Sequence, residues 1–434
     1  YQMGFLVFAG LALVALVGLT GVTAVFARWT GETPGCAVGV ARDGRPVLQK
    51  AFGMADLEHD VPNRPDTIFE AGSVSKQFTA AAVLLLAQEG KLSLDDPARK
   101  YVPELPDYGA PLTIRHMLQH TSGLRDWGEV ASIAGWPRTT RAHTHAHALD
   151  IISRQKALNF TPGTRYSYSN SGYNLAAIIV SRVSGMSFAD FSRQRIFEPL
   201  GMTRTSWRDD FKRIVKHRAL AYEPAGDGYR EDMPFENVHG NGGLLTTVGD
   251  LLRWNENFVT PVVGDAAFVA QQQTVAKLND GREQRYAFGL YVQPYRGVPE
   301  VSHSGSTAGY AAFLTRFPKQ HLSVAVLCNT ANALPTQYAR AVAEIFLEDA
   351  VAPAATTPAA EGTGRGGRGR GATGADAFKP EAADLAAYAG RYESDEAETA
   401  FTIALQGGDL VLRQRPDVVR RMRPVEKDVY AVPV

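Results

Sequence analysis

One stretch of this chain is apolar on almost every side of a helix. It is the run Val74–Gly90, which reads Val-Ser-Lys-Gln-Phe-Thr-Ala-Ala-Ala-Val-Leu-Leu-Leu-Ala-Gln-Glu-Gly and ends in a glycine suited to a helix terminus. A surface helix keeps one polar face, whereas this run has polar residues only towards its ends. We therefore expect a helix at the centre of a large domain, with other elements packed around it.

Strand patterns occur on both sides of this helix in the sequence. Asp43-Gly44 between Cys36–Ala41 and Pro46–Phe52 predicts a hairpin. Helical patterns dominate residues 112–258. Three more strands and an amphipathic helix are then predicted at Val301–Ser304, Tyr310–Phe317, Leu322–Leu327 and Pro335–Glu348. The simplest packing is an α/β fold, in which early and late strands form one antiparallel sheet flanked by helices, with a helical subdomain beside it.

The size and charge of the chain narrow its possible functions. Its 434 residues exceed one compact core, so at least one large domain with an appendage is expected. Lys plus Arg and Asp plus Glu both number 45, so no overall electric field attracts nucleic acid. We expect no nucleic-acid partner, and a substrate chosen by a local site.

The N-terminal run, residues 4–27, carries no charge and is long enough to cross a bilayer as a helix. We interpret residues 1–28 as a signal peptide or a transmembrane anchor, and the sequence leaves open whether the chain is cut near Val25-Phe26-Ala27. Both alternatives place the remainder outside the cytoplasm, periplasmic or secreted, with membrane contact only through this segment.

The C-terminal part has two sections. Residues 350–377 are rich in Ala, Pro, Thr, Gly and Arg and predict a disordered linker. In residues 378–434, Phe401–Leu405 and Leu410–Leu412 flank Gly407-Gly408, which predicts another hairpin. The sequence stops at Val434, too soon for a closed barrel of roughly eight strands, so we expect a partial β domain.

The start of the apolar helix carries a possible nucleophile. Ser73 and Lys76 are three residues apart and share one helical face, so their side chains can touch. A serine hydroxyl is a weak nucleophile until a base takes its proton, and a desolvated lysine can be that base. Such a pair is common by chance, so its interpretation depends on partners elsewhere in the chain.

Two later motifs supply such partners. Tyr168 and Asn170 stand in a polar aromatic loop before an apolar helix, where a phenol can relay a proton and an amide can hold lysine and substrate. In His303-Ser304-Gly305-Ser306, Gly305 lets a ligand approach the strand edge. The backbone N–H groups of Ser73 and Ser306 would then form an oxyanion hole.

Together the three motifs resemble those of the serine β-lactamase and penicillin-binding-protein superfamily. Tyr-Ser-Asn at the second motif is most similar to the branch with class C β-lactamases, DD-peptidases, D-aminopeptidases and esterases. The resemblance covers roughly residues 33–349. It implies a β-lactamase/transpeptidase-like fold, and the tail from Leu385-Ala386-Ala387-Tyr388 resembles a lipocalin-like β domain. Flanking agreement lies at Phe69–Ser73, His120–Leu124, Pro199–Met202 and Gly242–Leu244.

The third motif departs from the pattern of penicillin-recognising members, which usually have lysine where this chain has His303. Lysine is a permanent cation, whereas histidine is mostly neutral near pH 7, so binding of a substrate carboxylate should be weakened. We expect an exported serine hydrolase acting on an ester, a D-amino-acid amide or a peptidoglycan-like peptide, without a cofactor. The alternatives are a catalytically silent cell-wall-binding or sensor module, and a true class C-like β-lactamase.

Four further groups of residues are interpreted as structural. Cys36 and Cys328 could pair in an oxidising compartment, but buried free thiols are the favoured interpretation. The triplet His143, His145 and His147 is predicted to be a solvated face, and no metal site is expected. His116 and His120 are expected to make structural hydrogen bonds, and the glycines at 240, 242 and 243 to form a tight turn beside the cleft.

Overall fold

The computed structural model describes residues 20–138, 140–347, 351–352, 380–415, 418–426 and 429–432. Most of the apolar N-terminal run and nearly all of the predicted linker lie outside these residues.

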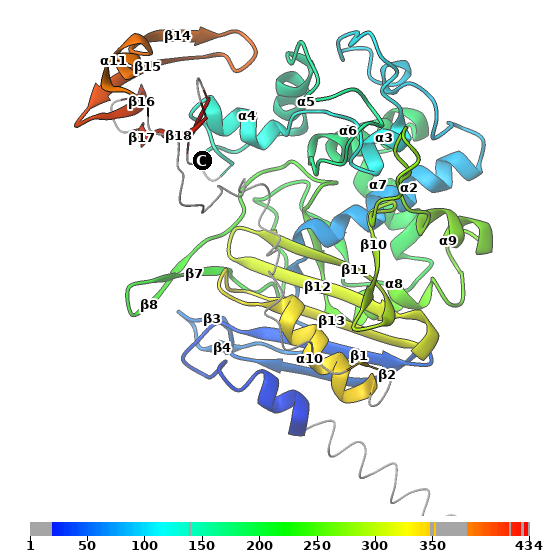
Figure 1. Ribbon diagram of the computed structural model, residues 1–434. Helices are drawn as coiled ribbons and strands as arrows, with labels where there is room; N and C mark the ends of the chain where they lie inside the picture. The colour runs from blue at the N-terminus through cyan, green and yellow to red at the C-terminus, as the bar shows by residue number, and fades with distance from the viewer. Residues whose placement is uncertain are drawn as a thin grey trace, which may run out of the picture.

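A six-stranded antiparallel sheet forms the centre of the large domain (Figure 1). The first strands of the chain lie beside the last strands of the domain, as predicted, because β1 pairs with both β2 and β13. The sheet order is β10-β11-β12-β13-β1-β2, with bounds Tyr291–Tyr295, Val298–Thr307, Tyr310–Phe317, Leu322–Cys328, Cys36–Arg42 and Arg45–Phe52.

Successive side chains along each strand point to opposite faces of this sheet, and helices cover both faces. In β1, Ala37 joins the cluster under α2 (Lys76–Gln88) and α8 (Val248–Glu256), whereas Val38 joins the cluster under α10 (Pro335–Leu347). On the first face, a Cβ at Gly39 of β1 would lie 3.1 Å from Val248 Cβ, so this glycine lets α8 approach closely. Helix α2, the predicted apolar helix, is buried along nearly its whole length.

The helical subdomain lies beside this sheet. Its helices are α3 Ile114–Leu118, α4 Trp127–Ile133, α5 His145–Ser153, α6 Ser171–Ser184, α7 Phe188–Ser192 and α9 Ala266–Gln272. Short strands connect the two parts: β3 Met54–Asp56 with β4 Val61–Pro62, β7 Tyr222–Ala225 with β8 Gly228–Glu231, and β5 Phe69–Glu70 and β6 Ser206–Trp207 on either side of β9 Leu244–Thr246.

The C-terminal residues form the predicted strand-rich domain, which lies beside α4 (Figure 1). Strands β15 and β16 are the hairpin expected around the Gly407-Gly408 turn. The elements are α11 Ala382–Ala387, a sheet of β14 Gly390–Ser394, β15 Thr399–Gln406, β16 Asp409–Arg415 and β17 Val418–Arg421, and the pair β18 Arg423–Glu426 and β19 Val429–Ala431.

The described end of the apolar N-terminal run packs onto the folded domain. Val22 and Phe26 are fully buried, and the Phe26 ring stacks on Phe52 at 4.9 Å between centroids. Cleavage after Ala27 would therefore remove a core side chain. Across the described ranges no single helix has the length and apolar character to cross a membrane. Helix α6 and the helical segment 188–197 together have that length and apolar character, but the two are bent by 82° relative to each other.

The two cysteines form a disulfide, so the prediction of free thiols is wrong. Cys36 and Cys328 stand directly opposite each other on the neighbouring antiparallel strands β1 and β13, with 4.0 Å between their Cα atoms. Residue spacing alone does not reveal this register, because the two positions are 292 residues apart.

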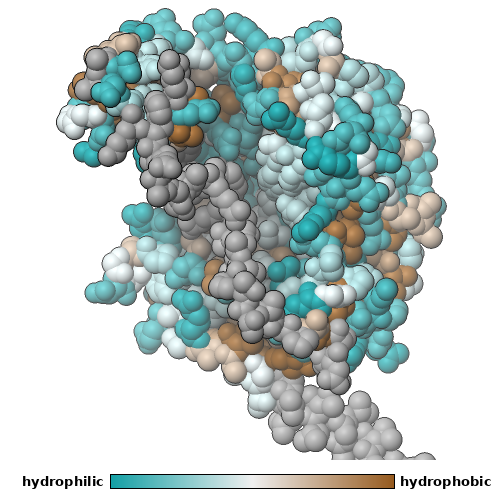
Figure 2. All heavy atoms as spheres, in the orientation of Figure 1, coloured by the Kyte–Doolittle hydropathy of each residue, from teal (hydrophilic) through white to brown (hydrophobic). Residues whose placement is uncertain are grey.

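The face of the molecule in Figure 2 is mostly hydrophilic, and its hydrophobic residues form small separate groups. Large exposed apolar side chains are scattered among the described residues and include Ile133, Trp136 and Ile214. Dispersed residues of this kind are normal on a folded protein and indicate no docking surface.

We expect Phe26→Ala to lower the free energy of unfolding by about 3–5 kcal/mol, because the change leaves a cavity between the sheet and α10. Guanidinium unfolding of the full chain measures this loss. Ile214→Ala, at a side chain that is 91% exposed, is the control and should change stability by less than about 0.5 kcal/mol. Equal stability of the two variants would show that the N-terminal residues are not part of the core.

Candidate active site

The turn that carries Ser73 is held rigidly at the start of α2. Residues Gly72–Ser75 form a 3-10 turn, and Gly72 has a positive φ of 50°. The Ser75 hydroxyl donates to the Gly72 carbonyl at 2.5 Å and accepts from the Leu244 N–H at 3.1 Å, which ties the turn to β9. Ser73 remains partly exposed, whereas Lys76 is completely buried.

Lys76 has the surroundings of a neutral base. Its Nζ lies 3.0 Å from Ser73 Oγ, 2.9 Å from Asn170 Oδ1 and 2.7 Å from the Asn241 carbonyl oxygen. Burial holds the pKa of the Lys76 amine well below its usual range. A neutral amine has two N–H groups and one lone pair. Asn170 and Asn241 can take the N–H groups, which leaves the lone pair for the Ser73 hydroxyl.

Tyr168 closes the other side of this pair. The Lys76 nitrogen lies 4.8 Å from the centre of the Tyr168 ring, so the phenol borders the Ser73–Lys76 pair. Burial raises the pKa of Tyr168 well above its usual value, an effect that the nearby Ser73 side chain partly offsets. The phenol therefore keeps its proton at neutral pH and can give it to a leaving group.

Asp126 was not predicted from the sequence, yet it fixes the second motif. Its Oδ2 accepts from the Asn170 side-chain amide at 2.9 Å and from the Asn170 backbone N–H at 2.7 Å. Its Oδ1 caps α4 by accepting from the Gly128 N–H at 2.9 Å. Since the amide nitrogen of Asn170 is committed to Asp126, its oxygen must face Lys76. The sequence does contain a signal for the helix cap, since Asp126 stands three residues before Glu129, the spacing of a capping box.

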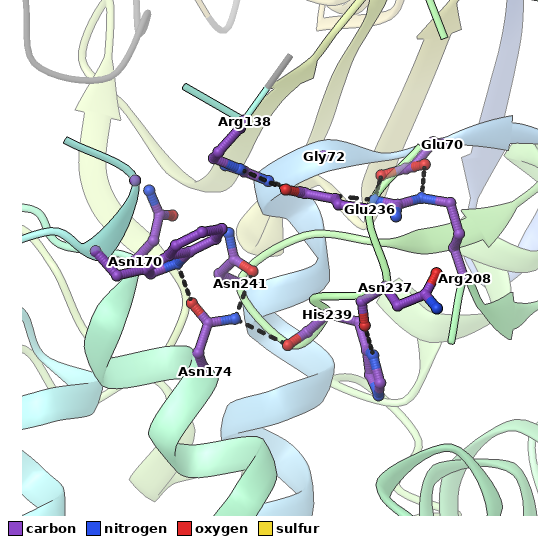
Figure 3. A network of polar contacts seen from close by, with 12 residues as sticks. Glu70, Gly72, Arg138, Asn170, Asn174, Arg208, Glu236, Asn237, His239 and Asn241 are labelled. Carbon is purple, nitrogen blue, oxygen red and sulfur yellow. Dashed lines mark hydrogen bonds and ion pairs between the residues drawn. The ribbon is translucent and has the colours of Figure 1, made fainter. Parts of the chain in front are cut away.

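Asn241 was also missed, and it lies within the predicted glycine turn. Asn174 donates to Asn241 Oδ1 at 2.7 Å and accepts from the Trp127 indole N–H at 2.7 Å (Figure 3). This chain of contacts connects α6, α4 and the turn that supplies a carbonyl to Lys76. A backbone carbonyl carries no side-chain signal, so the role of this turn could not be read from residue types.

A chain of four ions, buried except for the half-buried Arg138, lies beside the nucleophile turn (Figure 3). Arg208 makes two bonds to Glu70, at 2.8 and 3.0 Å, and lies 3.9 Å from Glu236. Glu236 in turn pairs with Arg138, whose Nε lies 2.9 Å from it. Charges alternate along this chain, so each buried ion has a partner of opposite sign. The chain anchors β5, three residues before Ser73.

The third motif lies against the nucleophile turn, and Gly305 makes room there for the Ala71 backbone, not for a ligand as the sequence suggested. A Cβ atom on Gly305 would lie 2.0 Å from the Ala71 carbonyl oxygen, and one on Gly72 would lie 2.5 Å from the Ser306 nitrogen. Neither position can therefore carry a side chain without moving the backbone. This contact places the N–H groups of Ser73 and Ser306 on facing stretches of chain, as an oxyanion hole requires.

His303 is buried and makes two hydrogen bonds. Its Nδ1 donates to the Ser304 carbonyl at 2.6 Å, and its Nε2 accepts from the Tyr286 hydroxyl at 2.9 Å. Burial lowers the pKa of His303 to about 3. The ring is therefore neutral at physiological pH and offers no charge to a substrate carboxylate, in agreement with the expectation from the sequence.

The other histidines are structural. The prediction of a solvated face is wrong, because His143 is buried with its Nε2 3.1 Å from the Trp136 carbonyl, and His145 packs against His239. The cause is the packing of α5 against α4 and α6, which sequence spacing alone did not reveal. His120 makes the expected structural hydrogen bond, accepting from the Ser169 N–H. In the described part of the chain, no group of three or more His, Cys, Asp or Glu residues is placed to hold a metal.

A family profile described as beta-lactamase matches residues 22–347. The chain belongs to the beta-lactamase family. It is 31% identical to a penicillin-binding protein of Bacillus subtilis over 70% of this chain and 69% of the relative. It is also 30% identical to a D-aminopeptidase of Gluconobacter oxydans over 73% of this chain, but it spans only 59% of that relative.

Solved structures show the same fold. A penicillin-binding-protein homologue from Pyrococcus abyssi has a TM-score of 0.66 and 26% identity, and the match covers 92% of this chain and 91% of that one. The D-amino acid amidase of Ochrobactrum anthropi SV3, solved with D-phenylalanine, has a TM-score of 0.65 and 21% identity over 76% of this chain and 98% of that one. The chain is thus a serine hydrolase of this family, built on the β-lactamase/transpeptidase-like fold.

The buried neutral His303 should make the protein sensitive to acid. Between pH 6.5 and about 3, an unfolded histidine binds a proton that folded His303 does not, so stability falls as pH is lowered, by up to about 1.4 kcal/mol per pH unit. We expect His303→Gln to lose less stability than wild type between pH 6.5 and 4, measured by urea unfolding. His59→Gln is the control, because the Asp56 hydrogen bond raises the pKa of that exposed histidine. An unchanged acid slope in His303→Gln would contradict the assignment.

Asp126→Asn should lower kcat/KM by about tenfold or more, because an amide cannot accept both bonds from Asn170 as well as a carboxylate does. Asp265→Asn is the matched control, since Asp265 caps α9 in the same way and lies outside the site. Steady-state kinetics on a chromogenic ester would separate the two. An equal loss of kcat/KM in both variants would show that Asp126 acts only as a helix cap.

Proposed function

We propose that this chain is an exported hydrolase that cleaves an amide or ester through an acyl-enzyme on Ser73. The observation that carries the proposal is the arrangement at Lys76. Two oxygen atoms occupy its N–H groups, and the Ser73 hydroxyl is the third neighbour at 3.0 Å. A buried lysine held in this way is a base aimed at one hydroxyl. A catalytically silent module would have no use for this arrangement, which disfavours that alternative.

The geometry supports a defined sequence of proton transfers. Lys76 takes the Ser73 proton as Oγ attacks the carbonyl carbon, and the resulting oxyanion is stabilised by the N–H groups of Ser73 and Ser306. Tyr168 then gives its proton to the leaving amine or alkoxide and recovers one from Lys76, which leaves the acyl group on Oγ. In the second half, water attacks the ester carbonyl and passes its proton to Lys76 through Tyr168. Ser73 leaves as the acid forms and regains a proton.

The substrate class follows from the charges near the site. His303 supplies no cation, so substrates that depend on a carboxylate at this position, including penicillins and peptides with a free C-terminus there, should bind weakly. Relatives of this chain are named D-aminopeptidase and D-amino acid amidase. We favour D-amino-acid amides or short peptides, with uncharged esters next, over a true β-lactamase.

Export remains part of the proposal, supported by the uncharged run at residues 4–27. Phe26 lies in the core, so cleavage near Ala27 would cost stability, and we favour retention of the segment. Membrane fractions washed with carbonate should retain the full-length chain, and protease added to spheroplasts should digest it while a cytosolic marker stays intact. Recovery of all the chain in the cytosol would contradict export.

A fluorophosphonate probe should label the wild-type chain and leave Ser73→Ala unlabelled, because only an activated hydroxyl attacks phosphorus rapidly. Ser153→Ala, at an exposed helix end, is the control and should label normally. Labelling of Ser73→Ala would refute the assignment of the nucleophile.

With the same proteins, D-Ala p-nitroanilide and short p-nitrophenyl esters should be turned over faster than a D-Ala-D-Ala peptide or a chromogenic cephalosporin. Rapid opening of the cephalosporin would favour the β-lactamase alternative.

A further inference from the structure

The turn between β14 and β15 makes the principal polar contact between the C-terminal domain and the catalytic domain. Its Glu396 carboxylate accepts from Arg125 at 2.6 Å and from the Lys156 backbone N–H at 3.0 Å. Its backbone carbonyl accepts from the Gln155 side-chain amide at 2.9 Å. The neighbouring Ala397 is buried in the main core cluster of the catalytic domain. The turn is therefore seated in this surface and does not merely rest on it.

Charge complementarity surrounds this contact. Glu398 lies 3.0 Å from Arg154, and Asp395 lies 3.8 Å from the Lys156 ammonium. Those two carboxylates are largely exposed, at 67% and 94%, so water and salt weaken their ion pairs. Glu396 is only 28% exposed and makes three hydrogen bonds. The Lys156 N–H and then Arg125 hold the pKa of Glu396 below its usual range.

The partner of Glu396 adjoins the active site. Arg125 precedes Asp126, the residue that holds both the backbone and the amide of Asn170. The Arg125 carbonyl accepts from the Ser171 hydroxyl at 2.7 Å, and that hydroxyl accepts from the Trp127 N–H at 2.9 Å. The segment between Arg125 and Trp127 is thus fixed to the start of α6 on one side and to the β14–β15 turn on the other.

We propose that Glu396 is a positioning residue of the active site, through which the C-terminal domain holds Arg125, Asp126 and so Asn170 in register with Lys76. The proposal rests on the proposed function and adds a role for the C-terminal domain. Loss of the Glu396–Arg125 pair leaves Arg125 with the neutral Gln155 Oε1 at 3.0 Å and loosens one side of the segment. The Asn170 oxygen then holds the Lys76 lone pair toward Ser73 less firmly. The effect falls on kcat, because the displaced Asn170 leaves the base Lys76 less well aimed at Ser73, whereas Glu396 itself contacts Arg125, Gln155 and Lys156 outside the site.

A double-mutant cycle on the full chain tests this role. We expect Glu396→Gln and Arg125→Met each to lower kcat on a p-nitrophenyl ester about ten- to hundredfold with little change in KM. The double variant should be no slower than the slower single variant, because both changes break the same contact. The acid limb of the kcat profile should also move in each, since Asn170 no longer fixes Lys76. Glu396→Asp, which keeps the charge, should recover part of the rate.

The matched control is Glu398→Gln, on the same turn but largely exposed, which should keep wild-type kcat. Thermal unfolding of each variant shows whether the fold is intact. Wild-type kcat and an unmoved pH profile in Glu396→Gln would overturn the proposal, and so would losses that multiply in the double variant. Failure of the proposed function is recognised separately, because the wild-type chain would then show no turnover that Ser73→Ala abolishes.

Discussion

Removing the Lys76 amine from water is the constraint on which the rest of this site depends. A charged amine buried without a counter-ion costs several kcal/mol, so the group becomes neutral, and a neutral amine needs acceptors for two N–H groups. Those acceptors, Asn170 and the Asn241 carbonyl, come from stretches more than ninety residues away in sequence. The apolar helix that buries Lys76 thus dictates both the base and the contacts that must surround it.

The supporting residues form successive layers around these acceptors. Asp126 orients Asn170, Asn174 holds the turn that contains Asn241, and the ion chain from Glu70 to Arg138 fixes the strand before the nucleophile. Glycines at 72 and 305 let two backbones meet where side chains would separate them. None of these residues reacts in the proposed mechanism, yet each limits the positions that the reacting atoms can take.

Much of this arrangement could be predicted from the sequence, because it follows from local patterns. Apolar runs located β11, β12, β13 and α2 to within a few residues, and the family motifs brought Ser73, Lys76, Tyr168 and the third strand together. What could not be predicted depends on long-range register or on the backbone. The pairing of Cys36 with Cys328 needs the exact opposition of two strands, and the contact of Glu396 with Arg125 spans 271 residues. The prediction of a solvated face for His143, His145 and His147 was wrong for the same reason, because the packing of α5 against α4 and α6 determines their burial.

The order of strands in the central sheet also bears on how the chain can acquire its structure. Strand β1 is completed by β13, whose final residue lies 292 positions further along the chain, so the sheet has a high contact order. During synthesis the β1–β2 hairpin leaves the ribosome before β13 is made. The edge of β1 that later pairs with β13 therefore stays unpaired while the whole helical subdomain is synthesised, and this strand is almost wholly apolar. Whatever protects that edge during synthesis determines how much of the protein escapes aggregation.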